Sequence, residues 1–247
     1  MKVDPFVQLR LLELQGLDST VDRLRHRRST LPEIAEMARL DGLVDALRDA
    51  VVRAATAVSD RARAQARFER EIEQVRSRKA RDEQRLASGS ITIPKQLQDL
   101  EHEVATLARR QSDLEDSELE VMERAETAEA ELAQLHSRRS GYLAGREVAQ
   151  AARDAAFVEI DAELQRLLAG RAALAETFPP DVLALYEKLR ASEGGVAVGE
   201  ITRGRCGGCH LDLMNNEKAA LRAAPPDELV RHDECRRIMV RTAESGL

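Results

Sequence analysis

The sequence predicts a mainly α-helical protein in which a long antiparallel coiled-coil hairpin precedes a small cysteine-containing domain. Three observations support this prediction. Apolar residues recur every 3.5 positions over most of the first 175 residues, and a Gly/Ser/Pro segment interrupts them near the middle. All three cysteines lie in the last quarter of the chain. We expect the hairpin to span residues 1–177, with its turn at about 88–94, and the second domain to span 178–247.

The composition is that of long, solvated helices and not of a large globular core. Of the 247 residues 33% are charged, and there is no Trp, two Tyr and four Phe. A long helix has this composition because it buries only a narrow stripe of side chains. The net charge of -6 provides no general attraction for nucleic acid or for an anionic membrane.

The same sequence indicates a cytoplasmic protein that does not associate with membranes. No stretch approaches the ~20 apolar residues that a transmembrane helix needs. The segment from Met1 to Arg10 lacks the apolar centre of a signal peptide. Three cysteines, an odd number, do not form a disulfide framework, which is consistent with a reducing compartment.

The outgoing arm of the hairpin consists of two helical segments. The seam of the first contains Leu14, Leu17, Val21, Leu24 and Leu31. Arg28 is its one polar interruption. Pro32 should kink or break this helix, because proline lacks an amide donor and clashes with the preceding turn. The heptads then continue from residue 37 to residue 86.

The returning arm begins after the turn at Ser88–Pro94 and keeps its apolar seam from Leu97 to Leu174, weakening in an Ala-rich stretch. A helix over 95–175 would be roughly 120 Å long at 1.5 Å per residue, and the two outgoing segments together are about as long. The equal lengths favour a monomeric hairpin, and a parallel dimer is the main alternative.

Polar seam residues suggest a register for the hairpin. If the helices pair directly at the turn, Gln65 lies near Glu118 and Arg28 lies near Asp154. Polar residues that meet across a seam specify alignment, because an unpaired one is costly to bury.

Ile91 and Ile93 lie in the turn, where helix pairing can no longer cover them. They either pack against the start of the returning helix or form a small contact site for a partner at the hairpin tip.

A short helix at Asp181–Arg190 and a strand at Val196–Ile201 are predicted before the cysteines, from helical and alternating patterns respectively. Two pairs of potential metal ligands follow, each with two residues between its members: Cys206 with Cys209, and His232 with Cys235.

Each pair would lie in a tight turn, called a knuckle here. Two knuckles together have the ligand spacing of a tetrahedral zinc site. Four protein ligands close the site, so one Zn²⁺ would be structural and would leave no position for a reactive water. The fold class is therefore a mainly α coiled-coil hairpin with a small C-terminal zinc ribbon. The ribbon itself, about 50 residues without an aromatic side chain, should need the metal in order to fold.

Nearly the whole chain resembles the bacterial coiled-coil zinc-ribbon proteins of the four-cysteine type, which are described as nucleic-acid-binding. The residues that carry the resemblance are Leu14–Asp18, Leu31–Glu33, Ser88–Gly89, Pro94–Leu97, Tyr186–Arg190, the Cys206 knuckle and Cys235–Ile238. The sequence departs from that pattern at His232, where the family has a cysteine. Because imidazole is an ordinary zinc ligand, a Cys3His site can replace the four-cysteine one.

Other interpretations of the cysteines explain less. Cys206-Gly-Gly-Cys209-His210 matches the attachment signature of c-type haem, but haem would leave His232 and Cys235 without a role. A redox dithiol needs a βαβ setting, which the sequence lacks. In zinc deaminases the cysteine pair follows the histidine motif, whereas here it precedes it. We assign His210 no role.

The sequence contains no recognisable catalytic motif, so we expect a non-catalytic adaptor or scaffold whose zinc ribbon docks a protein partner. The alternative is a nucleic-acid-binding accessory factor related to RNA or transcription, which would use arginines around the knuckles to contact phosphates. These arginines are Arg203, Arg205, Arg231, Arg236, Arg237 and Arg241. Residues 194–247 nevertheless carry eight basic and eight acidic side chains, and no aromatic residue follows Tyr186 to stack on bases.

Overall fold

The computed structural model describes residues 1–246 and contains long helices followed by a small sheet. The helices are α1 (Pro5–Ser29), α2 (Pro32–Ala87), α3 (Pro94–Ala175), α4 (Pro180–Ser192) and α5 (Asn215–Ala223). The strands are β1 (Val198–Thr202), β2 (Arg205–Cys206), β3 (Val230–Arg231) and β4 (Ile238–Val240). Leu247, the last residue of the predicted second domain, lies outside the described residues.

Proline is the first residue of each of the helices α1 to α4, at Pro5, Pro32, Pro94 and Pro180. Proline suits this position because the first amide of a helix has no internal acceptor and the ring presets φ. The predicted break at Pro32 is confirmed, since α1 ends at Ser29. Residues 88–93 separate α2 from α3, and the turn was predicted at about 88–94.

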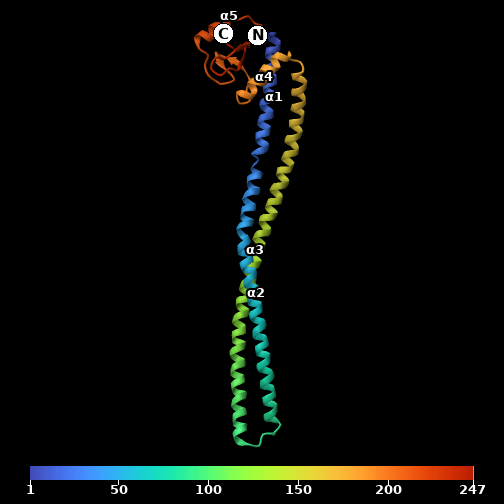
Figure 1. Ribbon diagram of the computed structural model, residues 1–247, viewed down its shortest axis with the longest axis vertical. Coiled ribbons are helices and arrows are strands. Elements are labelled where there is room, and N and C mark those ends of the chain that lie inside the picture. Colours follow the sequence, from blue (N-terminus) through green and yellow to red (C-terminus); the bar gives the residue numbers. More distant parts are fainter. Residues whose placement is uncertain (247) are drawn as a thin grey trace. The chain divides into compact units, whose positions relative to one another are not determined.

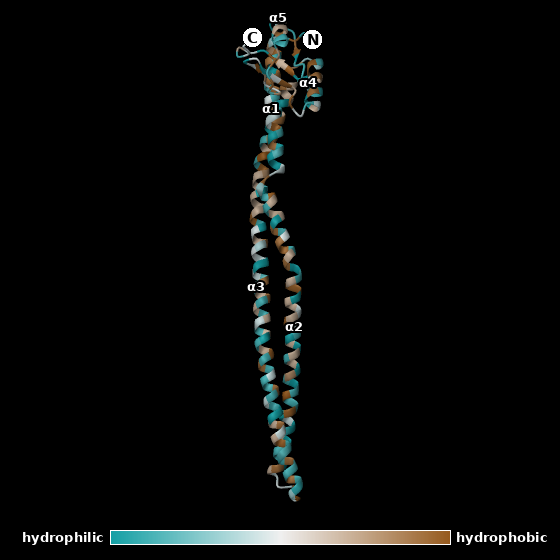
Figure 2. Ribbon diagram, turned by 90° about the vertical axis from the view of Figure 1, so that its left-hand side faces the viewer, coloured by the Kyte–Doolittle hydropathy of each residue, from teal (hydrophilic) through white to brown (hydrophobic). Residues whose placement is uncertain are grey.

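Two compact units make up the described chain, and α3 contributes to both. One contains residues 1–34 and the residues from 150 onward, and the other contains residues 35–149. In the second unit α2 and α3 lie side by side and antiparallel, joined by the loop at residues 88–93 (Figure 1). Hydrophilic and hydrophobic residues alternate along both helices (Figure 2), as expected of a narrow seam.

Buried apolar residues and ion pairs between helices hold this hairpin unit together. The buried apolar side chains are Met37, Leu40, Leu47, Ala54, Ile72, Leu100, Leu114 and Ala149. Arg76 pairs with Glu115 at 2.6 Å, and Arg146 pairs with Asp41 at 2.6 Å. The coiled-coil hairpin predicted from the heptads is confirmed.

The predicted pairing of Arg28 is wrong by one heptad. Its guanidinium binds Asp161 at 2.8 Å and stacks on the Phe157 ring 4.1 Å from the centroid, whereas Asp154 pairs with Arg153. The helical repeat is interrupted between α1 and α2, and a count of heptads from the hairpin turn does not detect the resulting offset. Gln65, which was predicted to lie near Glu118, donates to Glu69 of its own helix.

The sheet has the strand order β2-β1-β4-β3. β1 pairs antiparallel with β2 and parallel with β4, and β3 pairs antiparallel with β4. Side chains of the sheet pack against α1 and α4 in one apolar core, whose buried members are Val3, Leu11, Leu14, Phe178, Val182, Tyr186, Leu189, Ala197, Val198, Leu229, Ile238 and Val240. A second, smaller cluster surrounds the cysteines and contains Ile201, Cys206, Leu213, Leu221 and Met239.

The first three residues belong to the ribbon, which the sequence did not indicate. The Val3 amide donates to the Asp227 carbonyl at 2.6 Å, and the Leu229 amide donates to the Met1 carbonyl at 3.1 Å. The Val3 side chain is buried in the core that the sheet shares with α1 and α4. The sheet therefore does not depend on its own few apolar residues alone.

Candidate metal centre

The strand β1 leads directly to the first knuckle through a tight turn. Arg203 and Gly204 both have positive φ, at 52° and 75°, which is the conformation of a type I′ hairpin turn. The knuckle then lies directly against β1, where the Gly207 amide donates to the Glu200 carbonyl at 2.8 Å. A Cβ atom on Gly199 would come within 2.3 Å of the Gly208 nitrogen. Glycine at position 199 therefore permits this close approach.

The two knuckles have the same backbone hydrogen bonds. In the first, the His210 amide donates to the Cys206 carbonyl at 2.8 Å, and His210 has φ of 63°. In the second, the Arg236 amide donates to the His232 carbonyl at 2.9 Å, and Arg236 has φ of 60°. His232 thus occupies in its knuckle the place that Cys206 occupies in the other.

The four predicted ligands converge on one point. Their ligand atoms, three Sγ and one ring nitrogen, all lie within 4.8 Å of one another. The Cys206 and Cys235 sulfurs are 4.0 Å apart, and His232 Nδ1 lies 3.1 Å from Cys235 Sγ and 3.3 Å from Cys209 Sγ. Tetrahedral zinc with bonds of about 2.3 Å to sulfur would separate two sulfurs by about 3.8 Å. The donor set and its spacing therefore fit Zn²⁺.

The protein environment affects the two thiols of the first knuckle differently. Burial raises the pKa of Cys206 to about 11, because a thiolate loses solvation there. Burial also acts to raise the pKa of Cys209, but the Leu211 amide, the neighbouring thiols and the Arg237 charge together lower it. A metal must therefore displace a firmly held proton from Cys206.

Two family models together cover most of the chain. Residues 14–194 match the CT398-like coiled coil hairpin domain, and residues 205–239 match the C4-type zinc ribbon domain. The chain belongs to the CT398-like coiled-coil hairpin family. In this CT398-like protein one of the four cysteines of the zinc ribbon is replaced by His232, and neither family description names a catalytic activity.

Relatives of this protein share almost its full length. A protein of Mycobacterium tuberculosis strain H37Rv is 38% identical over 241 residues, 98% of each chain. A Mycobacterium leprae protein is 32% identical over 225 residues, 90% of this chain and 94% of that one. A solved Mycobacterium smegmatis structure covers 98% of this chain and 100% of its own, with 34% identity and a TM-score of 0.85.

Two more distant structures have the same fold. CT398 from Chlamydia trachomatis is 21% identical with a TM-score of 0.66, and the alignment covers 95% of this chain and 97% of CT398. The HP0958 protein from Helicobacter pylori is 14% identical with a TM-score of 0.51, covering 94% of this chain and 95% of that one.

A buried polar network involves residues of two of the sequence motifs on which the resemblance rests, Leu14–Asp18 and Tyr186–Arg190. Asp18 of α1 is 2% exposed and accepts hydrogen bonds from the Tyr186 hydroxyl at 2.7 Å and from Arg171 Nε at 2.9 Å. Arg190 Nε lies 3.3 Å from the same carboxylate. Gln15 accepts from the Ala197 amide at 2.7 Å, which links α1 to the segment before β1. Both motifs therefore have a structural role beside the ribbon.

The structure separates the six candidate arginines into two groups. Arg203, Arg205 and Arg236 are exposed, and Arg205 pairs with Asp212 at 3.1 Å. The other three donate to backbone carbonyls: Arg231 to Arg236, Arg237 to Glu193 and Val196, and Arg241 to Leu221, Ala224, Pro225, Pro226 and Glu228. Their guanidinium groups hold loops of the ribbon in place.

The isoleucines at the hairpin tip differ in exposure. Ile93 is 51% exposed and immediately precedes α3, and its carbonyl accepts the Leu97 amide at 3.1 Å. Ile91 is partly buried. Of the two isoleucines, Ile93 is therefore the exposed one.

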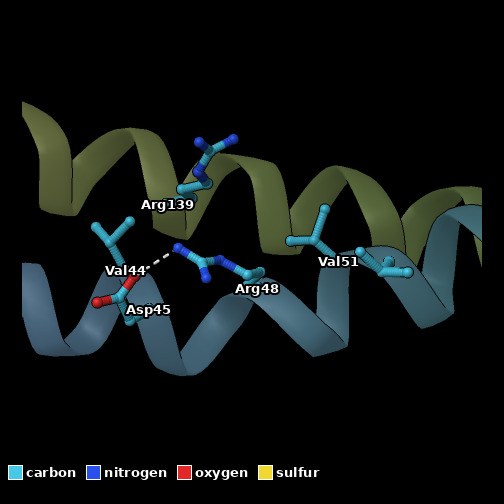
Figure 3. A pocket seen from close by; sticks show the side chains of 6 residues that line it. Val44, Asp45, Arg48, Val51 and Arg139 are labelled. Carbon is cyan, nitrogen blue, oxygen red and sulfur yellow. Dashed lines mark hydrogen bonds and ion pairs between the residues drawn. The ribbon is translucent and has the colours of Figure 1, made fainter.

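A shallow hollow lies between α2 and α3 in the hairpin unit (Figure 3). It is lined by Val44, Asp45, Arg48, Val51, Val52 and Arg139, and Arg48 pairs with Asp45 at 3.0 Å.

Among the described residues, no helix has an apolar stretch long enough to span a lipid bilayer.

Proposed function

We propose that this CT398-like protein is a non-catalytic cytoplasmic adaptor whose zinc ribbon docks a protein partner. Two exposed apolar side chains that follow the first knuckle are the observation that carries this proposal. Leu211 is 54% exposed and Met214 is 61% exposed, and both follow Cys209 within five residues. Exposed apolar side chains on a rigid turn suit a protein contact, because their burial drives association.

Structural zinc is part of the proposal. Cys206, Cys209, His232 and Cys235 would hold one Zn²⁺, which fixes both knuckles and therefore the loop that carries Leu211. With four protein ligands the metal has no open position, so its contribution is stability and not chemistry. Elemental analysis of the purified full chain should find one zinc per chain, and Cys209→Ser should lose it.

The internal hydrogen bonds of the arginines favour a protein partner over nucleic acid. Arg237 and Arg241 direct their donors at backbone carbonyls, which leaves fewer cations to meet phosphates. The nucleic-acid alternative would depend on the exposed Arg203, Arg205 and Arg236. Binding through several arginines would weaken steeply as salt concentration rises, because phosphate contacts release counterions.

Affinity capture from native cytosol tests the proposal. The full-length protein should retain a protein partner after nuclease treatment, and the double variant Leu211→Ser/Met214→Ser should lose it while keeping its zinc. Leu119→Ser is the matched control, because Leu119 is 57% exposed but lies on α3 in the hairpin unit. Capture that nuclease abolishes, or that falls steeply with salt, would replace the proposal with the nucleic-acid alternative.

A further inference from the structure

The buried imidazole of His232 has one ring nitrogen without a hydrogen-bond partner. His232 is 1% exposed, and its Nδ1 faces the sulfurs of Cys209 and Cys235. Its Nε2 has no hydrogen-bond partner among the described residues. Buried polar groups in native proteins are nearly always satisfied, so this nitrogen needs an explanation.

The carboxylate of Glu217, on the first turn of α5, lies close to this nitrogen. Glu217 is 7% exposed, and its Oε1 lies 3.7 Å from His232 Nε2. Two backbone amides already hold this carboxylate, because Met214 donates to Oε2 at 2.8 Å and Asp233 donates to Oε1 at 3.2 Å. The acceptor is therefore held by α5 and by the second knuckle together.

A histidine that binds a metal through one nitrogen almost always donates its other N–H to a carboxylate, a carbonyl or water, which fixes the tautomer and the ring orientation. His232 and Glu217 are arranged for this. We propose that Glu217 is a positioning residue: it accepts Nε2–H of His232 and so selects the tautomer whose Nδ1 binds zinc. A movement of less than about 1 Å would bring Nε2 and Oε1 into hydrogen-bond range.

This inference rests on the zinc occupancy proposed above and is specific to the histidine. A cysteine at position 232 has no second donor, and its thiolate would repel the buried carboxylate. Glu217 should therefore strengthen zinc binding only while position 232 is His. The replacement of one cysteine by His232 would then depend on an acceptor at position 217.

Glu217 could also act only by capping α5, since it accepts the Met214 amide. The two roles predict different patterns across two backgrounds. A cap-only role weakens zinc binding equally whether residue 232 is His or Cys. A positioning role weakens it with His232 and leaves it unchanged, or improves it, with His232→Cys.

Zinc affinity is measured on the full chain by competition with a chromophoric chelator. Glu217→Gln keeps one acceptor oxygen but removes the negative charge and the second acceptor, so it should lower the affinity by about 10-fold in the natural protein, the lower end of the usual effect of disturbing such a partner. In the His232→Cys background Glu217→Gln should not lower it. Glu234→Gln, which removes an exposed carboxylate beside Cys235, is the charge-matched control and should change nothing.

Nitrogen-15 NMR of the natural zinc-bound protein supplies a readout that does not need any variant. It should show Nδ1 of His232 bound to metal and a slowly exchanging proton on Nε2. Ligation through Nε2, or an equal loss of affinity in both backgrounds, would overturn the inference. A natural protein without zinc would overturn the proposed zinc site itself, whereas full zinc with an unaffected Glu217→Gln would overturn only the role of Glu217.

Discussion

Replacing Asp18 with Asn should strongly destabilise the unit that contains the ribbon. The Asp18 carboxylate accepts hydrogen bonds from Tyr186 and Arg171 and forms an ion pair with Arg190. These partners come from α3 and α4, two helices distant from α1 in sequence. Asn keeps the size of the side chain but removes the negative charge, and its amide group points hydrogens at the guanidinium groups. The two arginines then lack their buried counter-charge.

The expected loss of unfolding free energy in Asp18→Asn follows from the burial of these charged groups. Removing one partner of a buried ion pair costs roughly 3–5 kcal/mol, because the remaining charge has been desolvated without compensation. The side chains of Arg171 and Arg190 remain 20% and 22% exposed, so water partly compensates them. We therefore expect the unfolding free energy of this unit to fall by about 3 kcal/mol, near the lower limit of that range. Asp22→Asn is the matched control: Asp22 accepts from Arg190 at 2.7 Å but is 42% exposed, so its loss should stay within about 1 kcal/mol.

Hydrogen exchange with mass spectrometry suits this measurement, because peptides from residues 5–29, 150–175 and 180–192 report on this unit separately from the hairpin unit. Asp18→Asn should lower the opening free energy in these peptides and leave residues 40–140 unchanged. A cost of less than about 1 kcal/mol, or one equal to that of Asp22→Asn, would refute the reasoning that this carboxylate is the buried hub.

Three further predictions address the metal, the ribbon loops and the tip. Zinc affinity in chelator competition should fall as pH falls, since protons compete for thiolates and burial raises the pKa of Cys206 to about 11; affinity that rises in acid would contradict this. Arg241→Gln should destabilise the loop at residues 224–228 by about 2 kcal/mol in hydrogen exchange, whereas Arg203→Gln, at an exposed site, should have little effect. If the hairpin tip is a second docking site beside the ribbon, replacing Ile91 and Ile93 with Ser should abolish capture of the partner bound at the tip without changing helix content or melting. Unchanged capture would leave these isoleucines only a packing role.

Local sequence features determined much of this structure. Heptad periodicity predicted the hairpin, because a 3.5-residue repeat specifies a seam without knowledge of the partner helix. Pro32 and the segment before Pro94 marked helix ends, since proline acts on its own turn. The spacing of Cys206 with Cys209 indicated a knuckle for the same reason: two ligands three positions apart converge through a short, local turn.

Only the tertiary structure decided which distant groups meet. The pairing of Arg28 with Asp161 depends on how the broken helical repeat realigns along α3, and heptads define a seam only up to shifts of seven residues. The internal use of Arg241 could not be predicted, because a guanidinium beside a knuckle has the same sequence signature whether it faces solvent or a ring of carbonyls. In the sequence, Glu217 cannot be distinguished from any other acidic residue at the start of a helix. Only the packing of α5 places its carboxylate beside His232. Short-range order follows from residue type and spacing, whereas these contacts depend on how separate elements pack.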